Sequence, residues 1–74
     1  MIDIEKLNQS IAEEFDTDVN IIRPEANIRQ TLNLDSMRVM SLVVLVRRQT
    51  GVMLPVRHLQ QFTTFQTLYD YLNI

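Results

Sequence analysis

The sequence contains no cysteine and no tryptophan, and only one histidine, one glycine and two prolines among its 74 residues. Without cysteine, the chain forms neither a disulfide framework nor a thiolate metal site. The single histidine, His58, excludes a histidine-rich zinc site and argues against a self-contained Ser-His-Asp hydrolase. The scarcity of glycine and proline leaves few turn signals, which favours a few long helices over many short strands.

Charge of one sign and long hydrophobic runs are also missing. The net charge is −2 at pH 7, which gives no basic surface for nucleic acid. The longest apolar run covers residues 42–46, far too short to span a membrane, and the first residues do not lead us to expect a secretory signal. We therefore expect a single small, soluble domain over residues 1–74, in the cytoplasm, that neither binds nucleic acid nor inserts into a membrane.

The spacing of apolar residues predicts a helix over residues 3–15 and a second one over residues 36–50. Asp3 and Asp35 each stand at the position of an N-cap, and Gly51 follows the second segment as a C-terminal stop. The second segment is rich in β-branched residues but exceeds the length of an ordinary strand. Four of its residues share the face that we assign to the core: Val39, Leu42, Val43 and Val46.

A third main helix is expected near the end of the chain, where Thr63 and Gln66 fit a capping box. A short helix of one or two turns is expected over residues 56–61, with Leu59 facing inward. Residues 16–34 lose the helical periodicity, so we expect a long loop there with one helical turn near residues 18–22. The predicted fold class is all-α, with three main helices, one short helix and a long first loop.

The helix predicted over residues 36–50 has more apolar residues than one buried face needs. Met37, Met40 and Val44 fall on the side opposite its core face, and three arginines border them. An exposed apolar stripe with a polar rim is typical of a docking surface, and methionine suits surfaces that repack against several partners. The alternative is that neighbouring helices cover both faces.

Ser36 lies in the first turn of this helix, directly after the long loop, where we expect its side chain to be exposed. Its position alone fits an ordinary serine at a helix start. Serine catalysis is not indicated, because the chain has no Gly-x-Ser-x-Gly elbow and no carboxylate that is identifiable as a partner of His58.

The run Leu-Asn-Leu-Asp-Ser-Met at residues 32–37 resembles the attachment motif of acyl carrier proteins. The resemblance continues through residues 42–45, 50–55 and 62–72, and covers nearly the whole chain without gaps. It implies an acyl-carrier-protein-like four-helix bundle and a carrier rather than an enzyme. In that family a phosphopantetheinyl transferase moves 4′-phosphopantetheine from coenzyme A onto the serine, here Ser36. The thiol of this arm then holds acyl groups as thioesters and presents them to partner enzymes.

Other residues have expected roles at the arm. From their positions beside Ser36, we expect Asp35 and Arg38 to flank the attached phosphate, with Arg38 as its cation. We expect partner enzymes to dock on the exposed side of the helix, at Met37, Met40, Ser41, Val44, Arg47 and Arg48. By resemblance, the acyl pocket would be lined by Ile28, Val39, Leu42, Val43, Val46, Leu54, Leu59, Phe62 and Leu68. Several of these side chains are bulky, so we expect a small pocket and a long saturated chain that stays outside it.

Two departures from the family pattern carry information. Asn33 stands where the family commonly has glycine, and asparagine tolerates the positive φ that this turn needs. Fatty-acid carriers usually have carboxylates along the second helix, whereas here no acid follows Asp35 in that segment and arginines take their place.

The arginines favour a specialised carrier, of polyketide or secondary-metabolite type, over a housekeeping fatty-acid carrier. Its partner enzymes would have neutral or acidic docking patches, because like charges that face each other oppose binding. The alternative for the arginines is a solvated face. The acidic cluster of Glu13, Glu14, Asp16 and Asp18 is expected at the other end of the domain, where it would only solubilise the protein.

Two alternative functions remain open on the sequence alone. An aminoacyl or peptidyl carrier would use the same arm for a different cargo. An unmodified helical interaction module would keep the fold without the arm, although the intact Ser36 counts against it. The resemblance implies a monomer in each case.

Overall fold

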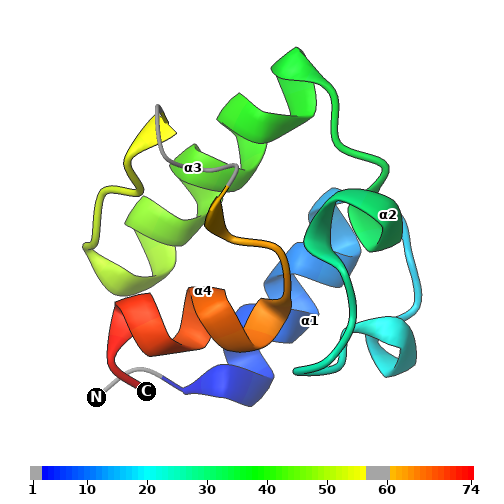
Figure 1. Cartoon of the computed structure of the whole chain (residues 1–74), viewed down its shortest axis with the longest axis horizontal. Helices are drawn as coiled ribbons and strands as arrows, with labels where there is room; N and C mark the ends of the chain where they lie inside the picture. Colours follow the sequence, from blue (N-terminus) through cyan, green and yellow to red (C-terminus); the bar gives the residue numbers. More distant parts are fainter. Residues whose placement is uncertain (1–2, 57–60) are drawn as a thin grey trace.

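The computed structural model describes residues 3–56 and 61–74. Its elements are α1 (Ile4–Glu14), the 3-10 turn η1 (Val19–Ile21), α2 (Ile28–Leu32), α3 (Ser36–Thr50) and α4 (Phe65–Leu72). In Figure 1, α3 crosses the upper part of the molecule and α4 lies below it. The regular structure of the described residues is helical apart from an isolated antiparallel bridge between Asn27 and Thr64. This confirms the all-α prediction.

None of the described helices is long and apolar enough to cross a bilayer.

Side-chain caps fix the ends of α1 and α3 where the sequence predicts them. A carboxylate oxygen of Asp3 accepts from the backbone N–H of Glu5 at 2.9 Å, and one of Asp35 accepts from that of Arg38 at 2.8 Å. Each cap satisfies an N–H group that has no partner inside its helix. Gly51 ends α3 in the left-handed region, with φ of 77°, where a residue without Cβ is unstrained.

The capping box of α4 lies one residue later than the sequence predicts. Thr64, not Thr63, is the N-cap, and its hydroxyl and that of Thr67 exchange hydrogen bonds with each other's backbone N–H groups. The usual motif has Glu or Gln at the third helical position, which only the Thr63 register provides, whereas in the Thr64 register the hydroxyl of Thr67 takes that part. The tertiary structure favours Thr64, because the carbonyl of Thr63 accepts from the N–H of Ile28 at 3.0 Å and is not available to α4.

The prediction of a loop through residues 28–32 is wrong, because these residues form α2. This helix has only five residues, too few for a periodic pattern to stand out. Asn27 caps it by accepting from the N–H of Gln30 at 2.9 Å, and its two buried residues are Ile28 and Leu32, four apart. The helical turn expected near residues 18–22 is confirmed as η1.

The short helix expected over residues 56–61 falls mainly on residues 57–60, outside the described residues. The inward position expected for Leu59 lies there too.

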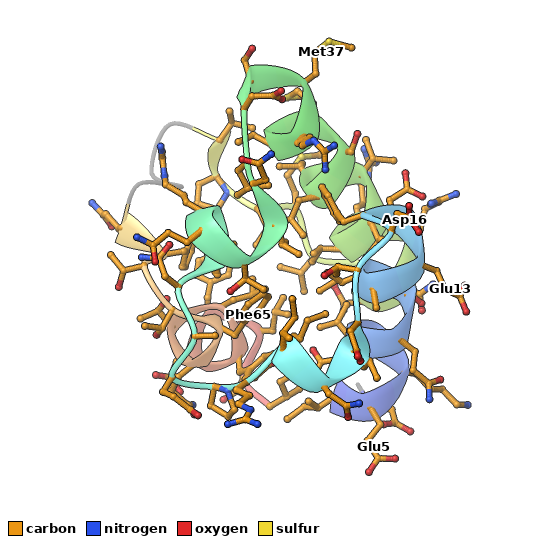
Figure 2. All side chains as sticks on the ribbon, turned by 90° about the vertical axis from the view of Figure 1, so that its right-hand side faces the viewer. Glu5, Glu13, Asp16, Met37 and Phe65 are labelled. Carbon is orange, nitrogen blue, oxygen red and sulfur yellow. The ribbon has the colours of Figure 1, made fainter. Side chains whose placement is uncertain are left out.

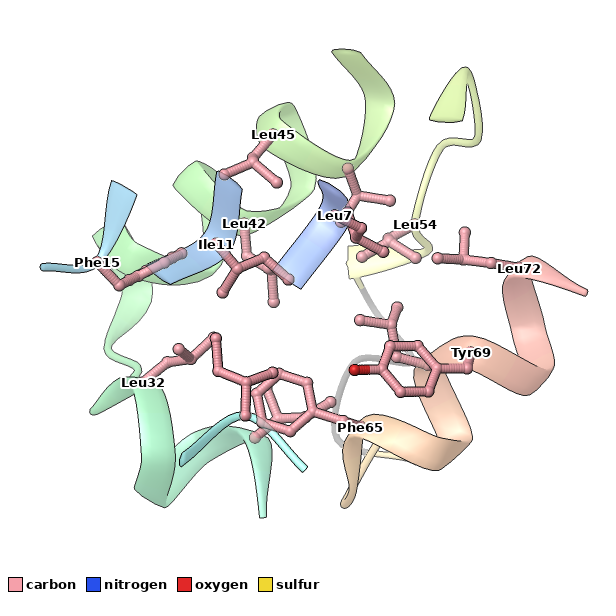
Figure 3. Packing of buried hydrophobic residues seen from close by; sticks show 14 of the residues in the cluster. Leu7, Ile11, Phe15, Leu32, Leu42, Leu45, Leu54, Phe65, Tyr69 and Leu72 are labelled. Carbon is pink, nitrogen blue, oxygen red and sulfur yellow. The ribbon is translucent and has the colours of Figure 1, made fainter. Parts of the chain in front are cut away.

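One hydrophobic core joins all four α-helices (Figure 3). Its buried residues are Leu7, Ile11, Ala12, Phe15, Ile22, Ile28, Leu32, Leu42, Val43, Leu45, Val46, Leu54, Phe65, Leu68, Tyr69 and Leu72. Three of the four core positions predicted on α3 are buried, whereas Val39 is only half-buried. Val39 is the fourth residue of α3 and therefore lies close to the N-terminal end of the helix. Leu45, which the sequence analysis did not assign to the core, is buried.

A polar link inside this core ties the last helix to the first. The hydroxyl of Tyr69 on α4 donates to the side-chain carbonyl of Asn8 on α1 at 2.7 Å. Burial raises the pKa of the Tyr69 hydroxyl above its ordinary value of 10.0, against the smaller lowering effect of the bond to Asn8.

We expect Tyr69→Phe to lower the free energy of unfolding by about 1 kcal/mol, because Asn8 loses its donor. The raised pKa means that wild-type stability is complete below pH 10 and falls as the pH rises through the folded-state pKa of Tyr69. Urea denaturation at pH 7 and above pH 10 measures both effects. The variant should lose this component of the alkaline decline, whereas Tyr71→Phe, at an exposed position, should retain it. Equal pH profiles for wild type and Tyr69→Phe would contradict the assignment.

Candidate functional site

The segment between α2 and α3 delivers Ser36 to the surface. Asn33 ends α2 in the left-handed region, with φ of 51°, which confirms the expected tolerance of asparagine at this turn. The N–H of Leu34 then donates to the carbonyl of Arg29 at 3.0 Å, and the half-buried Leu34 packs against the core. Asp35 follows in extended conformation, and α3 begins at Ser36. The chain therefore enters α3 through a tightly bonded turn.

Ser36 is the first residue of α3, and its side chain is exposed. Asp35 accepts hydrogen bonds from two backbone N–H groups at this end of the helix. Its side chain accepts from the N–H of Arg38, and its backbone carbonyl accepts from the N–H of Val39. The positive end of the helix dipole and the remaining first-turn N–H groups favour a negatively charged group here. A phosphate ester on the Ser36 hydroxyl would meet both.

Arg38 projects away from Ser36, because two residues on an α-helix are about 200° apart. It lines an open hollow of about 340 Å³ between the start of α3 and the end of α1. The lining residues are Glu14, Phe15, Asp16, Asp35, Met37, Arg38 and Ser41. The role of Arg38 as the cation of the phosphate stays a prediction. In the structure, Arg38 lines this acidic hollow.

The prediction that the acidic cluster lies at the other end of the domain is wrong for Glu14 and Asp16. Both line the hollow beside the first turn of α3. In Figure 2, Asp16 lies at the end of α1 nearer to Met37, and Glu5 lies at the other end of α1. This position is not readable from the sequence, because only the packing of α1 against α3 brings the two segments together.

The apolar stripe on α3 is exposed. Met37 is 80% exposed, Met40 49% and Val44 51%, so the described helices do not cover both faces of α3. Arg47 and Arg48 are exposed at the C-terminal end of the same helix. The remaining docking candidate, Ser41, is half-buried, and its hydroxyl donates to the carbonyl of Met37 at 3.3 Å. A docking role for these six residues remains a proposal.

The residues expected around an acyl chain enclose a cavity of only about 10 Å³, roughly the space that one water molecule needs. Its lining comprises Ile28, Arg29, Leu34, Val39, Leu42, Leu54, Phe62 and Leu68. Six of the nine candidates are among them, whereas Val43 and Val46 pack elsewhere in the core and Leu59 lies outside the described residues.

Two lining residues, Arg29 and Leu34, were not expected. Leu34 carried a usable signal, since an apolar residue directly before a cap tends to pack on the helix that follows. Arg29 carried no such signal, because its position in the lining depends on α2, a helix that the sequence did not predict.

The fold and the site define a class of protein: a small helical domain that exposes a serine hydroxyl at the N-terminus of α3. A family model described as "Phosphopantetheine attachment site" matches residues 5–72. The chain belongs to this family, that of the acyl carrier proteins.

Individual relatives agree with the family match. The chain is 33% identical over 67 residues to the acyl carrier protein of Syntrophobacter fumaroxidans, covering 90% of this chain and 83% of that protein. It is 27% identical over 70 residues to that of Thermosynechococcus vestitus, covering 95% of this chain and 86% of that protein. It is 28% identical over 72 residues to the polyketide-8 synthase acyl carrier protein 2 of Streptomyces avermitilis, covering 97% of this chain and 83% of that protein.

The protein is accordingly an acyl carrier and not a catalyst, and its prosthetic group is covalently attached 4′-phosphopantetheine. The residues at the start of α3 fit such a group. The Ser36 hydroxyl is exposed, the helix N-terminus favours the negative charge of a phosphate, and the helix is capped by Asp35 and not by Ser36. The absence of cysteine from the sequence fits as well, because the arm brings its own thiol. As a carrier, the protein interacts with enzymes that load and use acyl groups.

Proposed function

We propose that Ser36 is the attachment residue and that this protein carries acyl groups as thioesters on the attached arm. The observation that carries the proposal is the exposure of Ser36 at the first position of α3, directly after the capping residue Asp35. When attached, the arm supplies a thiol that holds an acyl group as a thioester. The match over residues 5–72 supports our further proposal that residues 1–74 form one carrier domain.

Attachment would transfer the phosphopantetheinyl group of coenzyme A to the Ser36 hydroxyl. The Ser36 hydroxyl oxygen forms a bond to the phosphorus that bears the pantetheine half of coenzyme A. The P–O bond to the other phosphorus of the diphosphate breaks, adenosine 3′,5′-bisphosphate leaves, and the serine proton passes to a base on the transferase. Asp35 holds the first turn of α3 in place, and the helix dipole stabilises the phosphodiester that results.

Intact mass measures whether this attachment occurs. After incubation with coenzyme A, magnesium and a broad-specificity phosphopantetheinyl transferase, the wild-type chain should gain one phosphopantetheine increment. No increment with several such transferases would contradict the proposed function and would favour an unmodified interaction module.

We further propose that the pathway is specialised, of polyketide or secondary-metabolite type, and that the protein works in the cytoplasm, where coenzyme A is at hand. Support for the pathway comes from α3, which has arginines at positions 38, 47 and 48 and no carboxylate. A relative named as a polyketide synthase carrier points the same way. Partner enzymes would then have neutral or acidic patches around an apolar socket that receives the apolar stripe of Met37, Met40 and Val44.

We expect Arg47→Glu combined with Arg48→Glu to slow acyl loading by the native loading enzyme about tenfold, because the exposed cations would no longer attract an acidic patch. The measurement is kcat/KM for acylation of the phosphopantetheinylated protein. Lys6→Glu combined with Arg23→Glu makes the same change in net charge at exposed positions away from α3. Equal rates for both variants and wild type would assign the arginines to a solvated face.

A further inference from the structure

All the sulfur of this chain belongs to methionine. The sequence has four methionines, at positions 1, 37, 40 and 53, and no cysteine. Thiols and thioethers are the side-chain groups that peroxides oxidise in proteins. Before the arm and its thiol are attached, an oxidant therefore meets four thioethers and no thiol.

Met37 is the most exposed methionine of the described residues. It is 80% exposed, against 55% for Met53 and 49% for Met40, whereas Met1 lies outside the described residues. In Figure 2 the side chain of Met37 extends outward from the first turn of α3. Because susceptibility to oxidation follows exposure, Met37 should react before Met40 and Met53.

The position of Met37 gives its oxidation a consequence for binding. It directly follows Ser36, so an enzyme that reaches the serine hydroxyl also covers this side chain. Met40 lies three residues further on, and these two thioethers with Val44 form the exposed apolar stripe. Neither methionine belongs to the hydrophobic core or packs against it. A polar change at Met37 or Met40 would therefore alter what binds to α3 and not the fold.

Oxidation of a thioether by a peroxide takes a single step. The peroxide transfers one oxygen atom to the sulfur of Met37, so that a sulfur–oxygen bond forms and the O–O bond breaks. The other oxygen of hydrogen peroxide takes up the proton of the transferred oxygen and leaves as water. Sulfur loses two electrons and the peroxide gains them. The resulting sulfoxide is polar, and its oxygen costs free energy when it enters an apolar socket without a hydrogen-bond donor.

We infer that Met37, together with Met40, is a reversible oxidation site: a peroxide converts the thioether to the sulfoxide, and enzymes that dock on the apolar stripe to reach Ser36 then bind more weakly. This inference rests on the proposed function, since it takes Ser36 as the residue modified and the stripe as a docking surface. Methionine sulfoxide reductases return the sulfoxide to the thioether, which restores the stripe. The serine hydroxyl itself is the same in both states.

The test oxidises the whole chain before the arm is attached, so that no thiol competes for the oxidant. Dilute hydrogen peroxide is applied until peptide mapping shows one added oxygen atom at residue 37, and catalase then removes the peroxide. The probe enzyme is a broad-specificity phosphopantetheinyl transferase with coenzyme A and magnesium. The readout is kcat/KM for the phosphopantetheine mass increment, and thermal unfolding checks that the oxidised chain is folded.

Two variants locate the effect on the surface. Met37→Leu with Met40→Leu removes both thioethers of the stripe and keeps it apolar at similar volume. Met53→Leu is the matched control, because it removes an exposed methionine that lies beyond the end of α3. Each protein is compared with its own untreated sample, so that an effect of the substitution on docking cancels. The stripe variant keeps two methionines that react with peroxide, at positions 1 and 53.

We expect residue 37 to gain oxygen before residues 40 and 53. Oxidised wild type and oxidised Met53→Leu should lose about tenfold in kcat/KM and recover after treatment with methionine sulfoxide reductases, whereas the stripe variant should stay within about twofold of its untreated sample.

Earlier oxidation of residue 53, an unchanged rate for oxidised wild type, or an equal loss in the stripe variant would overturn the inference and leave Ser36 as the attachment residue. An untreated wild-type chain that gains no mass increment would overturn the proposed function and this inference with it.

Discussion

Ser36→Ala should abolish attachment of phosphopantetheine completely, because alanine has no hydroxyl oxygen to form the bond to phosphorus. The mass of the variant should not change under conditions in which the wild-type chain gains one increment. The substitution removes one oxygen atom from an exposed residue at the first position of α3. Surface substitutions of this kind usually change stability by less than about 0.5 kcal/mol. The loss would therefore be chemical and not a consequence of unfolding.

Ser10→Ala is the matched control, because Ser10 lies on α1 and belongs neither to the docking candidates nor to the lining of the hollow. The control variant should gain the full increment, and the peptide that contains residue 36 should carry it in both proteins. An increment on Ser36→Ala, at any residue, would show that the attachment site is elsewhere.

Phe65→Ala should cause the largest loss of stability, about 3–5 kcal/mol in the free energy of unfolding. Phe65 is fully buried, and its ring centroid lies 6.4 Å from that of Tyr69 in a tilted arrangement. Figure 3 shows it among side chains from several segments of the core, including Leu32 and Tyr69. Its backbone N–H also donates to the carbonyl of Ala26 at 3.1 Å, which ties α4 to the segment before α2. Truncation would leave a cavity where these segments meet.

Chemical denaturation followed by circular dichroism measures this loss. A chain of this size has roughly 4–11 kcal/mol of stability in total, so the variant should lose about a quarter of it or more. Met37→Ala, at a position that is 80% exposed, is the comparison and should change stability by less than about 0.5 kcal/mol. A loss of less than about 1 kcal/mol for Phe65→Ala would show that the core tolerates the cavity and that α4 is not held as described.

The caps and the exposed stripe were predictable because they depend on local chemistry. Asp3 and Asp35 cap their helices through carboxylates that reach N–H groups two or three residues away. Met37, Met40 and Val44 share one side of α3 because 3.6 residues make a turn, whatever the helix packs against. Gly51 ends α3 for a reason intrinsic to the residue, its tolerance of positive φ.

The errors all concern contacts between segments distant in sequence. The choice of Thr64 over Thr63 as the cap of α4 follows from the bond between Thr63 and Ile28, which joins positions 35 residues apart. The helix α2 has too few residues to be stable on its own and depends on the burial of Ile28 and Leu32. The small size of the cavity agrees with the expectation from bulky side chains, but its lining was only partly predicted, because Arg29 and Leu34 contribute to it only once α2 has formed.

The sequence by itself determined the helical class, the helix ends and the presence of an attachment motif at the start of α3, because these depend on residues within a few positions of one another. Only the tertiary structure decided which surface lies beside the first turn of α3. The packing of α1 on α3 brings Glu14 and Asp16 into one hollow with Met37 and Arg38, although some twenty residues separate them in the chain. Charge acts through space and not along the sequence, so the electrostatic character of the site emerges only when the helices are packed.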